Sequence, residues 1–164
     1  MTIARHELVD PEITRYYHCV GRCVRRAFLC GTDHFSGQSY EHRRQWVVDR
    51  LRGLAEVFAV DVCAYAVMSN HYHLVLKLAP ERVERWSDDE VETRWRRLFR
   101  LAPGHALTEA KRAARLPLWR ERLASLSWFM RCSGNRGQTP IPTASATWRV
   151  AAARGRIRTA MIPT

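Results

Sequence analysis

The spacing of hydrophobic positions changes several times along this chain, and each change marks a new element. Residues 14–23 are rich in strand-favouring side chains, which predicts a first strand. From Tyr40 the apolar residues recur every three or four positions, and this spacing predicts a helix that ends near Ala59. The first sixty residues therefore give a strand followed by a helix.

Two short apolar runs follow this helix. Residues 60–68 and 71–78 have the composition of strands, and Ser69–Asn70 suits a tight turn between them, so the sequence predicts a β-hairpin. Side chains alternate between faces along a strand, which places His71 and His73 on the same face. Two imidazoles that point the same way can bind one divalent cation, or they can donate to carbonyl groups at the end of the strand.

Two further helices are expected in the second half. Ser87 and Glu90 form a capping box ahead of apolar residues at helical spacing, and Pro103–Gly104 ends that helix. A basic linker is expected next, and then a third helix with Pro117 in its first turn and apolar residues up to Met130. The linker and helix residues behind this prediction are Lys111, Arg112, Arg115, Trp119, Leu123 and Leu126.

The order of these elements predicts an α+β fold. It fits a ferredoxin- or RRM-like sandwich, in which an antiparallel sheet has its first and third strands in the centre and helices on one face only. The other face is then free for a ligand. We expect residues 1–132 to form this single domain. Residues 133–164 show neither periodicity and contain no acidic residue, so we expect a basic, disordered tail whose arginines either add phosphate affinity or have no role.

The composition narrows the classes of partner. The 164 residues suffice for one domain, and the net charge of +11 comes far more from arginine than from lysine. Arginine grips phosphate and stacks on bases, so a nucleic acid is the expected partner. No window approaches the ~20 apolar residues that span a bilayer, and the N-terminus has no apolar leader. We expect no membrane association, and a cytoplasmic location at the nucleoid.

The cysteines provide a third function class. Their number is five, and no Cys-x-x-Cys spacing occurs, which argues against a disulfide framework and favours buried free thiols. Cys19, Cys23 and Cys30 could form a zinc cluster with His34, but their spacings fit no common zinc site. A redox or zinc protein is therefore the least favoured alternative.

The histidine strand and the first strand together resemble a known family. The run Tyr65–Leu76, which contains Ser-Asn-His-Tyr-His, follows a strand that carries Tyr17–His18 and Arg22. This combination resembles the HUH single-tyrosine transposases, and more narrowly the REP-associated tyrosine transposases (insertion-sequence-two-hundred-like), over residues 16–130. Ser69 stands where the family commonly has a proline, a mild departure because serine also suits a tight turn.

The resemblance implies a chemistry and a partner. Such proteins are transposases of mobile elements that cleave and rejoin single-stranded or hairpin DNA, and they thereby carry out DNA transposition and recombination. By resemblance, His71 and His73 would hold Mg²⁺ or Mn²⁺ while a tyrosine attacks a phosphodiester to form a phosphotyrosine link. His18 is the candidate for a third ligand or a phosphate contact, with an ordinary hydrogen-bonded histidine as the alternative. Three arginines follow it and could clamp DNA phosphates or form a solvated basic loop: Arg22, Arg25 and Arg26.

The nucleophile of the family is missing. It is expected on a helix after the histidine strand, but none of the five tyrosines lies there, and Gly134, Gly137 and Pro140 cannot sustain such a helix. A truncated or frame-shifted gene would produce this pattern. We hypothesise a degenerate, cleavage-deficient transposase, with Tyr16 and Tyr17 on the neighbouring strand as the remaining candidates for a nucleophile.

A non-catalytic RRM-like nucleic-acid-binding module is the alternative on the same fold. Such modules stack bases on aromatic residues in a Lys/Arg-Gly-aromatic-Gly-aromatic pattern, and the chain contains no such segment. The sequence leaves the DNA target open, and it is compatible with either a monomer or a homodimer.

Overall fold

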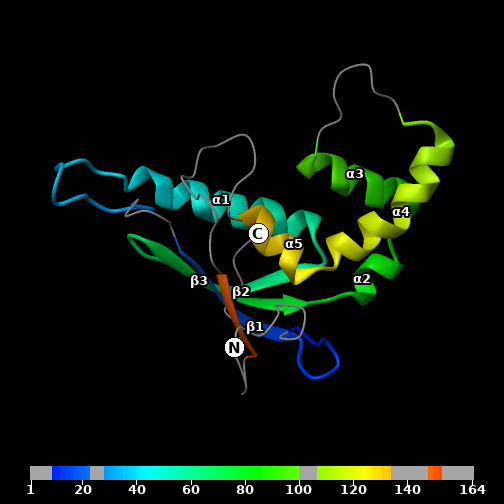
Figure 1. Ribbon diagram of the computed structural model, residues 1–164, viewed down its shortest axis with the longest axis horizontal. Coiled ribbons are helices and arrows are strands. Elements are labelled where there is room, and N and C mark those ends of the chain that lie inside the picture. The colour runs from blue at the N-terminus through cyan, green and yellow to red at the C-terminus, as the bar shows by residue number, and fades with distance from the viewer. Residues whose placement is uncertain (1–8, 23–27, 100–106, 134–147, 153–164) are drawn as a thin grey trace, which may run out of the picture.

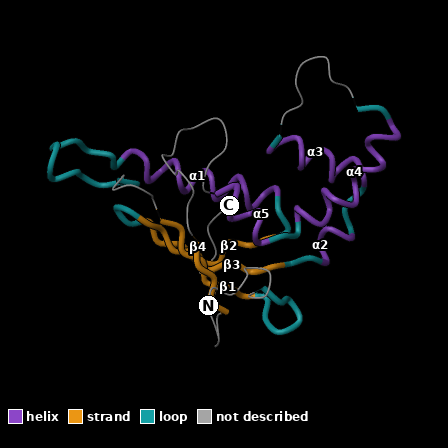
Figure 2. Tube along the Cα trace, in the orientation of Figure 1, coloured by secondary structure: helices purple, strands orange, loops and turns teal. Residues whose placement is uncertain are grey.

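The computed structural model describes residues 9–22, 28–99, 107–133 and 148–152. Within them, four strands form one antiparallel sheet in the order β2-β3-β1-β4 (Figure 2). The strands are β1 (Tyr16–Arg22), β2 (Val60–Val67), β3 (His71–Leu78) and β4 (Trp148–Ala152). The first and third strands therefore lie in the centre, and the predicted α+β fold with an antiparallel sheet is confirmed.

The helices lie on one side of this sheet. The described residues form α1 (His42–Val57), α2 (Glu81–Glu84), α3 (Asp88–Leu98), α4 (Glu109–Leu123) and α5 (Leu126–Ser133). Figure 1 shows α1 running along the sheet while α2, α3 and α4 gather at one end, with α5 beside α1. None of these helices is long and apolar enough to cross a bilayer. The opposite face of the sheet carries no described helix.

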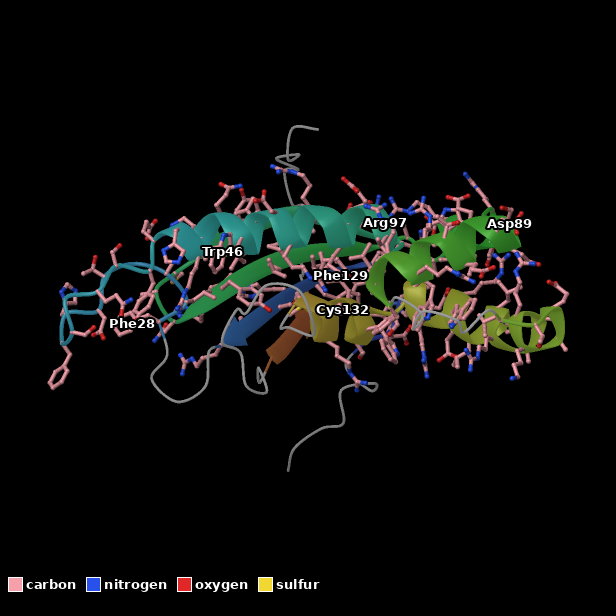
Figure 3. All side chains as sticks on the ribbon, turned by 90° about the horizontal axis from the view of Figure 1, so that it is seen from above. Phe28, Trp46, Asp89, Arg97, Phe129 and Cys132 are labelled. Carbon is pink, nitrogen blue, oxygen red and sulfur yellow. The ribbon has the colours of Figure 1, made fainter. Side chains whose placement is uncertain are left out.

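The core fills the space between the sheet and the helices. Leu54 of α1 is 1% exposed, and Leu74 and Leu76 of β3 are fully buried. Burying each such side chain contributes roughly 1.5–3 kcal/mol relative to leaving it in water. Phe129 of α5 meets Phe58 edge to face at a centroid distance of 5.6 Å, and Figure 3 shows Phe129 near the middle of the molecule. The sheet, α1 and α5 therefore share one core.

The helical half differs from the prediction after α3. Ser87 does cap α3, accepting from the amide of Glu90 at 3.2 Å. The expected basic linker, however, is helical from residue 109, so Pro117 lies inside α4 rather than in a first turn. An internal proline costs one helical hydrogen bond. Arg112 forms a salt bridge to Glu92 of α3 at 2.6 Å. This contact holds the N-terminal half of α4 against α3 and helps to offset the cost of the proline.

The structure also differs from the prediction within the expected tail. Residues 148–152 form β4 and pair with β1, with Tyr17 opposite Ala152 and Val20 opposite Arg149. Without them the edge of β1 would expose unpaired backbone groups. Backbone pairing requires no periodic hydrophobic pattern, which is why the composition of this segment did not reveal the strand. Residues 134–147 and 153–164 of the expected tail lie outside the described part.

Candidate metal and nucleic-acid site on the open sheet face

Three histidines lie on the sheet face that points away from the helices. Along β3, Tyr72 and Leu74 are buried while His71 and His73 are only partly buried, as the predicted alternation requires. The rings of these two histidines lie side by side, with centroids 5.0 Å apart and planes at 68°. His18 of β1 is on the same face. We name His18, His71 and His73 the histidine cluster.

His18 and His73 are bonded directly to each other. His18 Nε2 lies 2.8 Å from His73 Nδ1, and the two rings stack at 13° with centroids 5.0 Å apart. A neutral imidazole has one donor and one acceptor nitrogen, so one of these rings donates to the other. When His73 Nδ1 is the donor, its Nε2 presents a lone pair to a cation. His18 then serves as the partner that selects this tautomer.

His71 has a partner of the same kind. Its Nδ1 lies 2.5 Å from the side-chain oxygen Oδ1 of Asn70. The amide oxygen accepts only, so Nδ1–H donates and Nε2 carries the lone pair. Each histidine of the pair thus has its Nδ1 in a hydrogen bond, and among the described residues neither Nε2 forms one. The sequence predicted Asn70 only as part of the tight turn, and its position next to His71 was the available signal for this second role.

The turn that carries Asn70 is held by the segment after β1. The amide of Met68 donates to the carbonyl of His71 at 2.9 Å and closes the hairpin. The carbonyl of Ser69 accepts from the amide of Leu29 at 2.5 Å, and the Cys30 thiol donates to the carbonyl of Met68 at 3.2 Å. These bonds fix the turn from outside the hairpin, so the orientation of Asn70 does not depend on the turn alone.

The electrostatics of this face favour neutral imidazole and bound anions. Burial, together with His73 and Arg22, lowers the pKa of His71, which keeps the ring neutral and able to bind a cation. Arg22 is exposed and stands directly opposite His71 in the strand pairing. Its guanidinium group can therefore meet a phosphate beside the histidine pair. Arg25 and Arg26, the other predicted phosphate contacts, lie outside the described residues.

The two candidate tyrosines of β1 lie on opposite faces. Tyr17 is fully buried among the helices, its hydroxyl donates to the carbonyl of Thr14 at 2.7 Å, and burial raises its pKa. Tyr17 is thus not brought to the histidine cluster. Tyr16 is partly buried on the open face, two residues from His18. Two residues along a strand span about 7 Å, so Tyr16 is the tyrosine of β1 that shares a surface with the cluster.

The donor set fits a cation that keeps part of its own hydration. Within the described ranges, no group of three or more His, Cys, Asp or Glu side chains is arranged to hold a metal ion. His18, the expected third ligand, directs Nε2 at His73 instead. His71 and His73 nevertheless offer two imidazole nitrogens beside an arginine. Mg²⁺ and Mn²⁺ accept such partial protein coordination, because water and phosphate oxygens complete their shells.

The cysteines that the structure describes form no competing metal site. The four that the structure describes are buried free thiols, as predicted, and Cys23 lies outside the described residues. Burial raises the pKa of Cys19 to about 12, which makes this thiol a poor nucleophile and a poor metal ligand at neutral pH. No family model and no curated protein matches the chain. The residues of the open face therefore carry the functional interpretation.

Proposed function

We propose that this protein binds single-stranded or hairpin DNA on its open sheet face, as a cleavage-deficient member of the REP-associated, HUH single-tyrosine transposases. The supporting observation is the histidine pair: His71 and His73 share a face, each has its Nδ1 engaged in a hydrogen bond, and among the described residues neither Nε2 forms one. Strand position and hydrogen-bond partners both support the use of these rings to bind Mg²⁺ or Mn²⁺. The expected location is the cytoplasm, at the nucleoid.

The roles of the surrounding residues follow from their contacts. His18 and Asn70 are positioning residues, because each fixes the tautomer of one histidine. Arg22 contacts the DNA backbone next to His71. When bound, a divalent cation supplies the charge that neutralises the non-bridging oxygens of a phosphate. A strand of DNA can reach the partly exposed histidine cluster, since no helix among the described residues lies on this face (Figure 1).

The loss of cleavage follows from the tyrosines. The chain has no tyrosine beyond Tyr72, and Tyr72 is itself buried with its hydroxyl 2.9 Å from Ser133 Oγ. Tyr17 is buried on the wrong face. Of the two tyrosines of β1, Tyr16 is the one that shares the surface of the histidine cluster, on a strand rather than on a helix. The protein is therefore expected to retain DNA and not to cut it.

The test combines a metal titration with DNA binding. A 5′-labelled single-stranded hairpin is titrated with the full chain with and without Mn²⁺, and complexes are separated on native gels. Mn²⁺ is expected to strengthen binding of the wild-type chain and to have no effect on the His71→Ala/His73→Ala variant. His34→Ala is the matched control, because His34 is exposed and lies in a turn rather than on the sheet. It should behave as the wild type.

Three outcomes would change the proposal. A covalent protein–DNA band on a denaturing gel, lost in His71→Ala, would show an active transposase, and Tyr16→Phe would then test the remaining nucleophile. Hairpin binding that is unchanged by Mn²⁺ and by both histidine substitutions would favour the RRM-like binding module. Absence of any single-stranded DNA binding would overturn both. Light scattering on the same complex determines whether the bound species is a homodimer.

A further inference from the structure

A second place with its own chemistry lies in the helical layer, among α3, α4 and α5. It is a cavity of about 330 Å³. Its walls are aromatic side chains from all three helices and the residue after α3, namely Trp95, Phe99, Trp119 and Trp128. We name it the aromatic hollow. The histidine cluster is on the opposite face of the sheet from these helices, so the aromatic hollow is a separate site.

The rings leave part of their surface open. Trp95 and Trp119 stack at 17° with centroids 5.8 Å apart and form the buried floor, being 9% and 4% exposed. The ring centroid of Phe99 lies 4.6 Å from that of Trp95, and the ring of Trp128 meets Trp95 edge-on at a centroid distance of 5.9 Å. Phe99 and Trp128 are only partly buried. These two rings therefore line a hollow large enough for a small ligand.

The rim of the aromatic hollow is positively charged. Arg96, Arg115 and Arg122 line it, and none of its lining residues is acidic. The Arg122 guanidinium carbon is 4.4 Å from the centroid of Trp128, a cation–π contact that holds the charge at the edge of the hollow. Arg115 is exposed on α4, and Arg96 pairs with Glu92. The hollow thus joins aromatic walls to cationic groups.

A smaller hollow continues the same surface. It has a volume of about 160 Å³ and shares Phe99 and Trp128 with the first, so these two rings stand between the two spaces. Arg50 and Arg131 line it, and the Arg131 guanidinium carbon is 4.9 Å from the centroid of Trp128. Trp128 is therefore covered by two guanidinium groups, those of Arg122 and Arg131, and Phe99 is the ring between the two hollows that no guanidinium group of the described residues covers.

We propose that the aromatic hollow binds an unpaired nucleotide, with the base against Phe99 and the phosphate at Arg115 and Arg122. Aromatic walls alone would suit any apolar molecule, and arginines alone would suit any anion. A nucleotide is a planar ring joined to an anion, and it uses both features together. The smaller hollow would take the adjoining nucleotide of a strand. This site does not depend on the histidine pair.

The test measures nucleotide binding in the absence of free divalent cations. In buffer containing EDTA, the full chain is titrated with a fluorescent six-nucleotide single strand, with dAMP and with inorganic phosphate. The wild type is expected to bind the strand, and Phe99→Leu and Arg115→Ala are each expected to weaken binding about tenfold. Arg85→Ala is the matched control, an exposed arginine of the same helical layer that does not line the hollow, and its affinity should be unchanged. Circular dichroism verifies that each variant is folded.

Each result supports or overturns the proposal. Unchanged affinity in both Phe99→Leu and Arg115→Ala would overturn it, and so would competition by inorganic phosphate as strong as that by dAMP. Binding of dAMP as tight as that of the strand would identify a free nucleotide as ligand, and binding of the strand alone would identify an unpaired base within a nucleic acid. The His71→Ala/His73→Ala variant should keep nucleotide binding in EDTA, so failure here is distinct from failure of the metal site.

Discussion

The open sheet face and the aromatic hollow hold their side chains by different means. In the histidine cluster, hydrogen bonds connect ring nitrogens to specific atoms, as between His18 and His73 at 2.8 Å. In the aromatic hollow, Trp95 and its neighbours are held by ring packing and by guanidinium groups on ring faces. Hydrogen bonds fix single atoms and suit a cation, whereas packing fixes a flat surface and suits a base. The two places are thus prepared for different ligands.

The scaffolds beneath them differ as well. His18 and His73 stand on the two central strands, each of which is paired on both sides. The hollow stands on helices joined by ion pairs that are partly or fully exposed, such as Arg120 to Asp88 at 2.7 Å. Exposed pairs of this kind contribute about 0–1 kcal/mol each. Local opening should therefore cost less free energy at the hollow than at the sheet.

The largest expected effect is the loss of Mn²⁺ affinity when both histidines of the pair are replaced. His71→Ala/His73→Ala should lower Mn²⁺ affinity by at least about 100-fold, because even the loss of an outer hydrogen-bond partner costs about 10–100-fold. Phe99→Leu should leave Mn²⁺ affinity unchanged. Isothermal titration calorimetry with both variants measures this. A loss of Mn²⁺ binding in Phe99→Leu would show that the two places are not independent.

The next effect tests the residue that connects the two layers. A Cβ at Gly21 would lie 2.3 Å from Cζ of Tyr72, whose hydroxyl in turn meets Ser133 of α5. Gly21→Val should therefore lower the free energy of unfolding by about 2 kcal/mol or more. Urea denaturation measures this loss.

Gly53 offers a matched control for this substitution. It lies in α1 with no neighbouring atom within 4 Å of an added Cβ, so Gly53→Ala should stabilise the protein by roughly 0.5–1 kcal/mol. Gly21→Val should cost less stability in a Tyr72→Ala background than in the wild type, because the clash is absent there. If both glycine substitutions behaved alike, the close approach of Tyr72 would not be the cause.

The open face could be predicted from the sequence because it depends on local alternation. Residues two apart on a strand share a face, so the strand pattern alone places His71 and His73 together. The central position of β1 followed from the order of elements. The bond between His18 and His73 could not be predicted, because it depends on the register of two strands whose partners are 55 residues apart.

The aromatic hollow and β4 could not be predicted, for two different reasons. The hollow joins rings from three helices, and helical spacing shows that each ring is apolar but not which rings meet. The start of α4 was predicted too late for another reason: Pro117 is typical of a first turn, whereas Thr108 caps the helix by accepting from the amide of Lys111. β4 is added by backbone pairing to β1, which leaves little trace in the side-chain pattern.

A moderate effect concerns the partners that orient the imidazoles. Asn70→Ala removes the hydrogen bond made by Nδ1 of His71, and His18→Leu removes the one made by Nδ1 of His73. Both variants keep the two Nε2 atoms that are proposed to bind the metal. Each should weaken Mn²⁺ binding about tenfold, the lower end expected for such partners. Calorimetry measures the affinities, and urea denaturation separates them from any loss of folding. Unchanged metal affinity in both variants would show that the hydrogen bonds do not position the ligands.

The smallest effect is the pH response of His71. Its pKa is lowered below 6.5 by burial, by His73 and by Arg22, so the folded state binds the proton less tightly than the unfolded chain does. Above pH 6.5 the group therefore contributes nothing to stability. Stability falls as the pH drops below that value, because the unfolded chain takes up the proton first.

Nuclear magnetic resonance of the histidine ring protons tests this, with the urea-unfolded chain as reference. The titration midpoint of His71 should lie below that of the unfolded chain and should rise in Arg22→Ala, because one positive neighbour is removed. No such response is expected at the aromatic hollow, whose lining residues contain no histidine. A midpoint at or above the unfolded value would mean that the open face does not favour neutral imidazole. The open face and the aromatic hollow would then not differ in this electrostatic property.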